Sequence, residues 1–334
     1  TDPLNRRYLS GFSGTAGWLL VTAQQTLLAV DFRYFERAAR EAPDWEQVRV
    51  KTTMADALVE MVATAGVERL GFESDHLTVA QFKELREKLP AITPVPLEKL
   101  VLSMRAVKDE SEIAALRSAI ACSDAAFAHL CAVIEPGMTE AQVSWELESY
   151  MRQHGASATA FPTIVGSGPN GAMPHATATD RVIQAGEPIV IDFGAVVDGY
   201  CSDITRSFCL GSAEERYHET WQLVLEAQQA VVRNLRPGMT GVEADALARD
   251  VFEAAGQGEA FGHGLGHGVG LQIHEEPRMG RLAQEHIIEP GQVITVEPGL
   301  YYPGWGGERI EDVVVVREDK VVVLTGAAKE PVVG

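Results

Sequence analysis

A repeated segment is the feature of this sequence that most restricts its fold. The stretch IEPGMTEAQVSWELESYMRQHGA, which begins at Ile134, matches LRPGMTGVEADALARDVFEAAGQ, which begins at Leu235. Each stretch has Pro-Gly-Met-Thr before a predicted helix, and the threonines, Thr139 and Thr240, are of a type preferred at helix N-caps. Further along, AGEPIVIDFG matches EPGQVITVEPG. The second half of the chain therefore predicts two copies of one helix-plus-sheet unit.

The repeat also pairs residues of similar chemistry. Asp192 aligns with Glu297, and His175 falls near His274 with slightly different spacing. A duplication that served only structure would need no acidic residue inside an apolar strand, because a buried charge requires a partner. We therefore predict that one histidine and one strand carboxylate in each copy have a functional role.

A change of pattern divides the chain into two predicted domains, 1–105 and 106–334. In the first, apolar strands such as TLLAVDF and helical stretches such as MADALVEMVATAG predict a small α/β domain. Its end is expected in PAITPVPLEKL, where three prolines indicate a boundary segment. The second domain begins with a long amphipathic helix capped by Asp109 or Ser111. Together they predict an α+β protein.

The opening stretch TDPLNRRYLSGFSG is interpreted as a loop that leads into a strand. No strand or helix is predicted before it. We therefore expect the first strand and helix of the N-terminal domain to be absent from this sequence.

Charge and cysteine content exclude several classes of function. The net charge is -19, and no cluster of lysine and arginine offers the basic face that nucleic acids or anionic membranes require. No apolar run reaches the roughly 18 residues of a membrane span. The four cysteines form no CxxC pair, so we expect buried free thiols and a cytoplasmic location.

The segment PIVIDFGAVVDGYCSDITRSF predicts a hairpin that brings two aspartates together. Asp198-Gly199 is a dipeptide typical of two-residue hairpin turns. With the turn there, Gly194 faces Asp203, and Asp192 lies on the same face of the sheet. Like charges so close repel unless a cation lies between them. Two exposed strand aspartates are the alternative, which the apolar flanking residues disfavour.

The later segment VITVEPGLYYPGWGGERIEDVVVV repeats this design. Glu297 closes one apolar strand, Glu311 lies in the next, and GWGG is expected to form the turn. Because Glu308 and Asp312 are close neighbours of Glu311, the spacing leaves open which of these acids points inward.

Three histidines lie in the glycine-rich segment FGHGLGHGVGLQIHEE. His263, His267 and His274 fall within twelve residues, and the segment that carries them includes five glycines. So many glycines exclude a regular helix, and with it the helical HExxH zinc motif. Isolated core histidines are common, but this density favours ligands or catalytic groups. His175, in the polar segment NGAMPHATATD, fits either a structural or a functional role.

Together these motifs resemble a known family. HGLGHGVGLQIHE, DFGAVVDGYCSDITR, VEPGLY and ERIED are similar to the Xaa-Pro peptidases of the pita-bread metallopeptidase superfamily. RYLSGFSGTAGWLLV resembles the creatinase-like N-terminal domain of these enzymes, so the resemblance covers nearly the whole chain. It implies a C-terminal pita-bread domain with an internal pseudo-twofold repeat, and commonly a homodimer.

The resemblance also implies a role for each site residue. The metal ligands would be Asp192, Asp203, His267, Glu297 and Glu311, with Asp203 and Glu311 bridging two ions. Four carboxylates and one imidazole suit Mn²⁺ best and tolerate Co²⁺ or Zn²⁺. The residues implied to act on the substrate are His175 and His274 at the tetrahedral intermediate, and His263 and Arg309 in the substrate pocket. Glu297 or a bridging carboxylate would accept the proton of the attacking water.

The implied activity is hydrolysis of the bond between an N-terminal residue and proline. Within it, the short two-domain chain slightly favours an Xaa-Pro dipeptidase (prolidase) over an aminopeptidase P, which acts on longer peptides. A methionine aminopeptidase is disfavoured by the N-terminal domain and by ERIED. A creatinase-like hydrolase or a non-catalytic scaffold is disfavoured by the complete ligand set.

Overall fold

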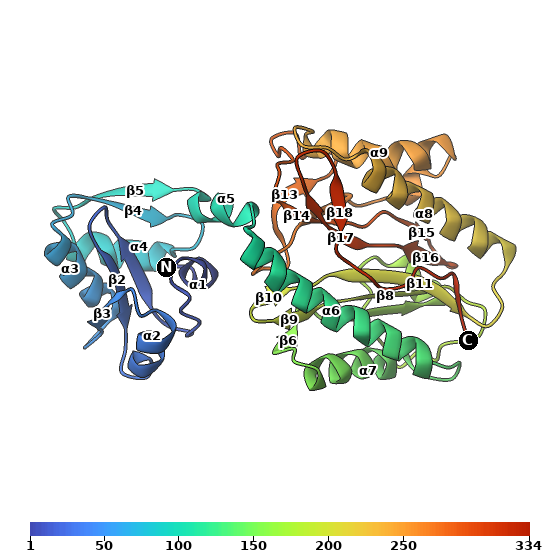
Figure 1. The fold of residues 1–334 in the computed structure, drawn as a ribbon, viewed down its shortest axis with the longest axis horizontal. Coiled ribbons are helices and arrows are strands. Elements are labelled where there is room, and N and C mark those ends of the chain that lie inside the picture. Colours follow the sequence, from blue (N-terminus) through green and yellow to red (C-terminus); the bar gives the residue numbers. More distant parts are fainter. The chain divides into compact units, whose positions relative to one another are not determined.

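The computed structural model describes residues 1–334, which form two compact units, Thr1–Arg105 and Ala106–Gly334 (Figure 1). Both units contain helices and sheets, so the predicted α+β class is confirmed.

The N-terminal unit contains two small sheets. One has the order β1-β2-β3, and the other pairs β4 with β5. The strands are β1 (Trp18–Val21), β2 (Thr26–Val30), β3 (Glu46–Arg49), β4 (Arg69–Glu73) and β5 (Thr93–Leu97). The helices are α1 (Pro3–Ser10), α2 (Phe35–Glu41), α3 (Met54–Ala65), α4 (Val79–Lys88) and α5 (Leu100–Ala106). Met61 and Val62 of α3 pack with Leu27 and Ala29 of β2 in the core of this unit.

The opening segment is a helix, so its prediction as a loop was wrong. The side chain of Asp2 accepts a hydrogen bond from the Asn5 amide and caps α1. Pro3 occupies the first turn, where its missing N–H is not needed. Gly11 ends the helix with a φ of 77°. The capping signals were present in the sequence, but the short polar helix has too few apolar residues for a visible period.

The proline-rich segment predicted as a boundary contains a strand, β5, that the sequence analysis did not predict. β5 runs parallel to β4, with Pro94 beside Leu70 and Pro96 beside Phe72. The Thr93 amide donates to the Glu68 carbonyl oxygen. The alternate residues at this edge need no N–H, so proline at every second position is tolerated.

The C-terminal unit has two helix pairs, with strands between them (Figure 1). The helices are α6 (Glu110–Val133), α7 (Glu140–Gln153), α8 (Glu215–Asn234) and α9 (Gly241–Ala254). Two short 3₁₀ helices are η1 (Gly168–Ala172) and η2 (Gly258–Ala260). The strands of the first half and the C-terminal strand are β6 (Ala158–Thr159), β7 (Ile164–Ser167), β8 (Ile189–Phe193), β9 (Ala195–Val197), β10 (Tyr200–Cys201), β11 (Ile204–Leu210) and β19 (Val332–Val333). Those of the second half are β12 (Gly266–Gly268), β13 (Glu275–Met279), β14 (Val293–Val296), β15 (Gly299–Tyr302), β16 (Gly306–Arg309), β17 (Asp312–Val316) and β18 (Val321–Val323).

The internal repeat is confirmed by the geometry of its helix starts. Thr139 caps α7 and Thr240 caps α9, and each threonine amide donates in return to the side chain of the third helical residue, Gln142 or Glu243. Apolar residues of α6 and α7 pack on the sheet β19-β11-β8-β7, and those of α8 and α9 pack on β14 and β17. Each copy therefore buries its strands beneath its own helix pair.

Helix α6 is long and apolar enough, by length and composition alone, to cross a membrane. In the fold, its residues Leu116, Ala126 and Leu130 are completely buried within the unit. A helix packed in a protein core has the same composition.

The two predicted hairpins are confirmed. Asp198 and Gly199 take φ values of 47° and 77°, and Val197 pairs with Tyr200. The same register continues to the pair Asp192 and Thr205.

In the second hairpin, Val296 pairs with Asp312 and Tyr302 pairs with Gly306, so the two arms keep the same register throughout. This register places Glu297 opposite Glu311. Its turn covers residues 303–305, slightly earlier than the GWGG that was predicted to form it.

Candidate metal centre

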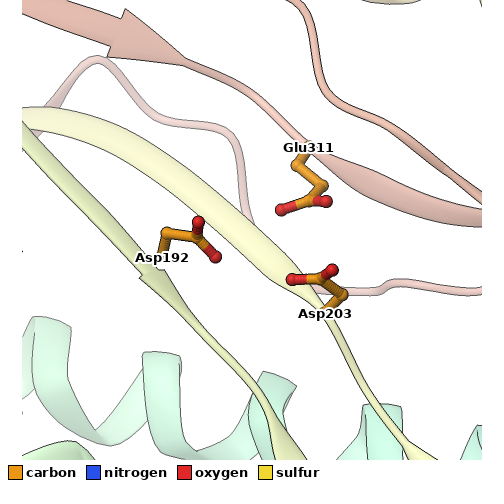
Figure 2. A group of neighbouring side chains, drawn as sticks. All are labelled: Asp192, Asp203 and Glu311. Carbon is orange, nitrogen blue, oxygen red and sulfur yellow. The ribbon is translucent and has the colours of Figure 1, made fainter. Parts of the chain in front are cut away.

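Three buried carboxylates meet between the two hairpins. Asp192 lies on β8, Asp203 lies just before β11, and Glu311 lies between β16 and β17. One oxygen from each lies within 4.8 Å of the others. Figure 2 shows the three carboxyl groups pointing toward one another. The predicted meeting of Asp192 and Asp203 is therefore confirmed.

Backbone pairing brings Glu311 to this cluster. Its amide donates to the Thr205 carbonyl oxygen at 3.1 Å, which joins the second hairpin to β11 of the first. The neighbouring acids have other surroundings. Asp312 bonds to the Arg206 guanidinium at 2.9 Å, and Glu308 is buried beside Tyr217. Of the three acids that the spacing left open, Glu311 is the one that points toward Asp192 and Asp203.

His267 and Glu297 complete the group of five predicted ligands. The Nε2 atom of His267 lies 3.6 Å from Asp203 Oδ2 and 3.4 Å from Glu297 Oε1. The other ring nitrogen, Nδ1, lies 3.0 Å from the Gly268 carbonyl oxygen. A proton on Nδ1 satisfies that carbonyl and leaves the Nε2 lone pair directed at the carboxylates.

The chemistry of this group fits bound cations. Burial and the charges of neighbouring acids raise the pKa of Asp203 and of Glu311 well above the usual range. Burial raises the pKa of Glu297 to about 7 and lowers that of His267 to about 3, which keeps the imidazole neutral. The Oδ1 atom of Asp192 is buried without a hydrogen-bond partner. Divalent cations would relieve the repulsion and coordinate this atom.

Arg309 was predicted to line the substrate pocket, and it does border the cavity beside the carboxylates. Its Nη2 atom donates to Asp192 Oδ2 at 2.6 Å, and its Nε atom donates to Thr205 Oγ1 at 3.0 Å. The Thr205 hydroxyl in turn donates to Glu311 Oε2 at 2.7 Å. Arg309 therefore orients two carboxylates of the cluster, and it is only 2% exposed.

Thr205 and Tyr301 are site residues that the sequence interpretation missed. The Tyr301 hydroxyl accepts from Arg309 Nη1 at 2.6 Å and lies 2.9 Å from His263 Nε2. Both could have been identified from the residue pairs across the predicted hairpins and from the alternation of faces along each strand. Thr205 lies opposite Asp192, and Tyr301 is four residues beyond Glu297, on the same face of the strand.

A cavity of about 850 Å³ opens beside the carboxylate cluster. All the predicted site residues border it, which brings His175 and His274 together from the two copies of the repeat. Its wall includes the apolar side chains Phe161, Ile273 and Met279. A cavity of this volume accommodates a small ligand or a short peptide end.

The surroundings of His263 and His274 favour the uncharged form of each ring. Burial lowers the pKa of His263 to about 4, so its Nε2 can accept the proton of the Tyr301 hydroxyl. Burial, together with the charge of Arg278, lowers the pKa of His274. The His274 ring packs edge-on against the ring of His267, with centroids 4.4 Å apart. His175 lies in an exposed loop at the cavity wall.

A buried ion pair supports the segment that carries His274. Lys108 Nζ donates to Glu275 Oε2 at 3.1 Å, and both side chains are almost fully buried. The other oxygen of Glu275 accepts from the Gln272 amide at 3.1 Å. Glu275 therefore closes the turn that precedes it and holds His274 beside His267.

Comparisons with known proteins agree with this geometry. The sequence model of metallopeptidase family M24 matches residues 114–318 of this chain. The sequence model of the creatinase/prolidase N-terminal domain matches residues 1–107. An Xaa-Pro dipeptidase of Pyrococcus horikoshii is 37% identical, over 98% of this chain and 91% of that protein.

Two solved structures share the fold over nearly the whole chain. An Xaa-Pro dipeptidase from Bacillus anthracis has a TM-score of 0.95 and 42% identity, covering 99% of this chain and 93% of that one. An X-Pro aminopeptidase from Thermotoga maritima has a TM-score of 0.95 and 36% identity, covering 99% of this chain and 94% of that one. The predicted pita-bread fold with a creatinase-type N-terminal domain is thereby confirmed.

Proposed function

This chain belongs to metallopeptidase family M24, and we propose that it is a dinuclear Xaa-Pro peptidase. Such an enzyme hydrolyses the peptide bond between an N-terminal residue and proline. The observation that carries the proposal is the convergence of five ligand-type side chains beside a cavity that His175, His263 and His274 also border. The relatives named Xaa-Pro dipeptidase and X-Pro aminopeptidase supply the substrate class.

The metal centre is assigned residue by residue. Asp192 would hold one ion, His267 and Glu297 would hold the other, and Asp203 and Glu311 would be shared by both. The oxygen-rich donor set favours Mn²⁺, with Co²⁺ or Zn²⁺ as alternatives. When bound, the ions supply an acidified water as nucleophile and an electrophile for the substrate carbonyl. Four carboxylates balance the charge of two divalent cations.

The protein groups around the centre handle protons and developing charge. Glu297, with a pKa raised by burial to about 7 before metal binds, is one candidate acceptor for the proton of the attacking water, and a bridging carboxylate is the other. His274, whose pKa is lowered by burial, is a neutral N–H donor for the oxyanion. His175 borders the same cavity and shares this role.

The preference for proline follows from the form of its amide. Proline has no amide N–H and a fixed φ, so recognition must rely on the shape of its ring. His263 and the apolar wall of the cavity provide that surface. The free amine of the substrate lies toward the carboxylate cluster, which limits cleavage to the first residue.

A substrate panel tests this proposal. The purified chain is loaded with Mn²⁺ and given an Xaa-Pro dipeptide, an Xaa-Pro-Yaa tripeptide and a Met-Ala peptide. We expect cleavage of both proline substrates, with the dipeptide slightly preferred. Brisk tripeptide turnover without dipeptide turnover would assign an aminopeptidase P instead. Cleavage of Met-Ala without a proline requirement would indicate a methionine aminopeptidase.

We also infer a homodimer and a cytoplasmic location. The dimer follows from the family resemblance. The four cysteines are free thiols, as expected in a reducing compartment. Light scattering of the purified chain measures its mass, and a monomer across the working concentration range would contradict the dimer.

A further inference from the structure

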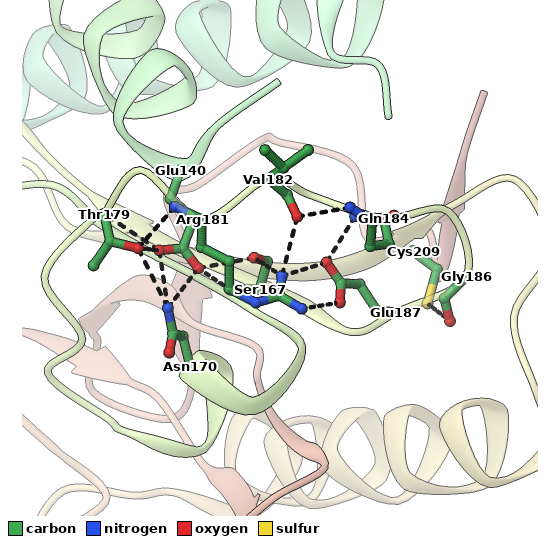
Figure 3. A network of polar contacts seen from close by, with 10 residues as sticks. All are labelled: Glu140, Ser167, Asn170, Thr179, Arg181, Val182, Gln184, Gly186, Glu187 and Cys209. Carbon is green, nitrogen blue, oxygen red and sulfur yellow. Dashed lines mark hydrogen bonds and ion pairs between the residues drawn. The ribbon is translucent and has the colours of Figure 1, made fainter. Parts of the chain in front are cut away.

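A second buried carboxylate lies outside the metal centre. Glu140 is the first residue of α7 and is completely buried. It accepts hydrogen bonds from the amide and the hydroxyl of Ser167, both at 2.8 Å. It also accepts from the amide and hydroxyl of Thr179, at 3.1 and 2.6 Å, and from the Asn170 side chain at 3.1 Å (Figure 3). Figure 3 shows these donors gathered around one carboxyl group.

Glu140 is ionised despite its burial. Burial alone would raise its pKa, but the hydrogen bonds from Thr179, Ser167 and Asn170 outweigh this effect and lower the pKa. Hydrogen bonds to a charged carboxylate are stronger than those between neutral groups. The first turn of a helix also stabilises a negative charge. Glu140 is therefore a strong anchor for the segment of residues 167–181, which supplies its hydrogen-bond donors.

That segment carries a histidine of the cavity. His175 lies between Asn170 and Thr179, two of the residues that donate to Glu140. Backbone bonds from the start of α7 reinforce the far end of the segment, because the Ala141 amide donates to the Thr179 carbonyl oxygen at 2.9 Å. Next to the histidine, the Pro174 carbonyl oxygen accepts from Arg309 Nη1 at 3.3 Å. Glu140 therefore holds the segment on both sides of His175, and Arg309 holds it at the residue next to His175.

The cation nearest this network does not neutralise Glu140 directly. Arg181 makes two contacts of 2.6 Å with the Glu187 carboxylate, and its Nη1 atom also donates to the Ser167 hydroxyl at 2.6 Å (Figure 3). Ser167 therefore connects the Arg181–Glu187 pair to Glu140. The charge of Glu140 is held by neutral donors that all belong to one segment and its flanking strand.

The second copy of the repeat anchors its histidine segment in another way. Gly241 takes the place of Glu140 after the N-cap threonine. A side chain there would lie 2.2 Å from the Arg278 carbonyl oxygen, so the backbone packs directly on that segment. The Gly241 amide donates to the His286 carbonyl oxygen, and its own carbonyl accepts from the Gly280 amide. Both copies therefore tie a histidine-bearing segment to the start of the repeated helix, and only the first uses a side chain.

We propose that Glu140 is a positioning residue that holds His175 at the cavity through its bonds to Ser167, Asn170 and Thr179. The proposal rests on the proposed function, in which His175 contacts the substrate. Glu140 itself touches neither the cavity nor the carboxylate cluster, so it acts through the segment. Nothing in its contacts involves a metal ligand.

A double-mutant cycle with Glu140→Gln tests the proposal. The glutamine keeps the shape but removes the charge and half of the acceptor capacity. We expect kcat/KM for an Xaa-Pro substrate to fall on the order of 10-fold in the wild-type background, with unchanged metal content. In the His175→Ala background, Glu140→Gln is expected to cause little further loss. Equal losses in both backgrounds would overturn the proposal, because the effect would then not pass through His175.

Hydrogen exchange of the metal-free protein gives a readout that is independent of activity. We expect faster amide exchange within residues 167–181 in Glu140→Gln and unchanged exchange in the matched control Glu243→Gln, which alters the cap of the second copy. Thr179→Val, which removes one donor, provides a milder variant should Glu140→Gln fold poorly, and it is expected to act in the same direction. Unchanged exchange in this segment would contradict the anchoring role.

The two proposals fail in different ways. A wild-type chain that cleaves no Xaa-Pro peptide contradicts the proposed function, while the exchange measurement still decides whether Glu140 holds the segment. An active wild type whose Glu140→Gln variant has full activity and unaltered exchange contradicts only the positioning role.

Discussion

At the scale of single residues, the metal centre depends on side chains that need not bind metal themselves. Arg309 bonds to Asp192, and Thr205 bonds to Glu311, so two carboxylates of the cluster have fixed orientations. Tyr301 extends this support to His263. The planar guanidinium of Arg309 reaches Asp192, Thr205 and Tyr301 simultaneously. A lysine has a single donor position and cannot reproduce this arrangement.

Arg309→Lys is therefore expected to reduce activity strongly. With Asp192 and Tyr301 no longer held together, we expect kcat to fall on the order of 100-fold. Steady-state kinetics with metal analysis measures the effect. Arg317→Lys, which alters a partly exposed pair with Glu110, is the control and is expected to behave as wild type. Full activity in Arg309→Lys would show that the three bonds are unnecessary.

Removing one charge from the cluster is expected to have opposite effects on metal binding and on metal-free stability. Asp203→Asn or Glu311→Gln should abolish turnover and lower metal content, because each removes a carboxylate that we propose both ions share. The same variants should raise the Tm of the metal-free protein, because burial and neighbouring charges disfavour ionisation at these positions. Calorimetry and metal analysis check both effects. Retained turnover with a full metal complement would show that these are the wrong carboxylates.

At the scale of elements, the hairpins explain how much the sequence could predict. The Asp198-Gly199 turn fixes the register, and the register alone determines that Asp192 and Asp203 share a face. The same logic places Glu297 opposite Glu311, although the sequence alone could not choose between Glu311 and its acidic neighbours. That choice depends on the Glu311–Thr205 pairing, a contact between segments 106 residues apart.

The elements that were missed are those whose signals are local and weak. Helix α1 is short and polar, so it is defined by its caps and not by an apolar period. Strand β5 contains two prolines, which is compatible only with an edge position that the sequence does not reveal. For β5, pairing with the neighbouring strand β4 therefore decides the conformation.

The Lys108–Glu275 pair predicts a large effect from a small change. Lys108→Met would remove a buried cation that bonds to the Glu275 carboxylate, and we expect the free energy of unfolding to fall by about 3–5 kcal/mol. Chemical denaturation measures this change. Lys320→Met, at an exposed position, is the control with little expected effect. A stability loss no larger than that of the control would show that the pair contributes nothing.

At the scale of the whole molecule, the carboxylate cluster should make metal-free stability depend on pH. The pKa of Glu297 is raised by burial to about 7, and those of Asp203 and Glu311 are also raised. A carboxyl group whose pKa is higher in the folded protein binds its proton more tightly there. Its stabilising effect is therefore complete below the unfolded pKa, near 4, and is lost as the pH rises through the folded pKa.

Thermal unfolding of the metal-free protein between pH 5 and pH 8 tests this reasoning. We expect Tm to fall as the pH rises, with Glu297 alone contributing on the order of 3 kcal/mol. Saturating Mn²⁺ should abolish most of the decline, since bound cations compensate the ionised carboxylates. A metal-free Tm that rises or stays level over this range would contradict the pKa directions given above.

The unbroken register of the second hairpin also governs how the chain can change in length during evolution. Glu297, Tyr301, Arg309 and Glu311 keep a common face only while both arms retain their residue counts. A single-residue insertion within either arm would turn every later side chain to the opposite face. Residues 303–305 lie beyond the last paired position, where added residues leave the register intact. New loops that diversify this protein can therefore be accommodated at the hairpin tip, while the arms can change in residue type but not in length.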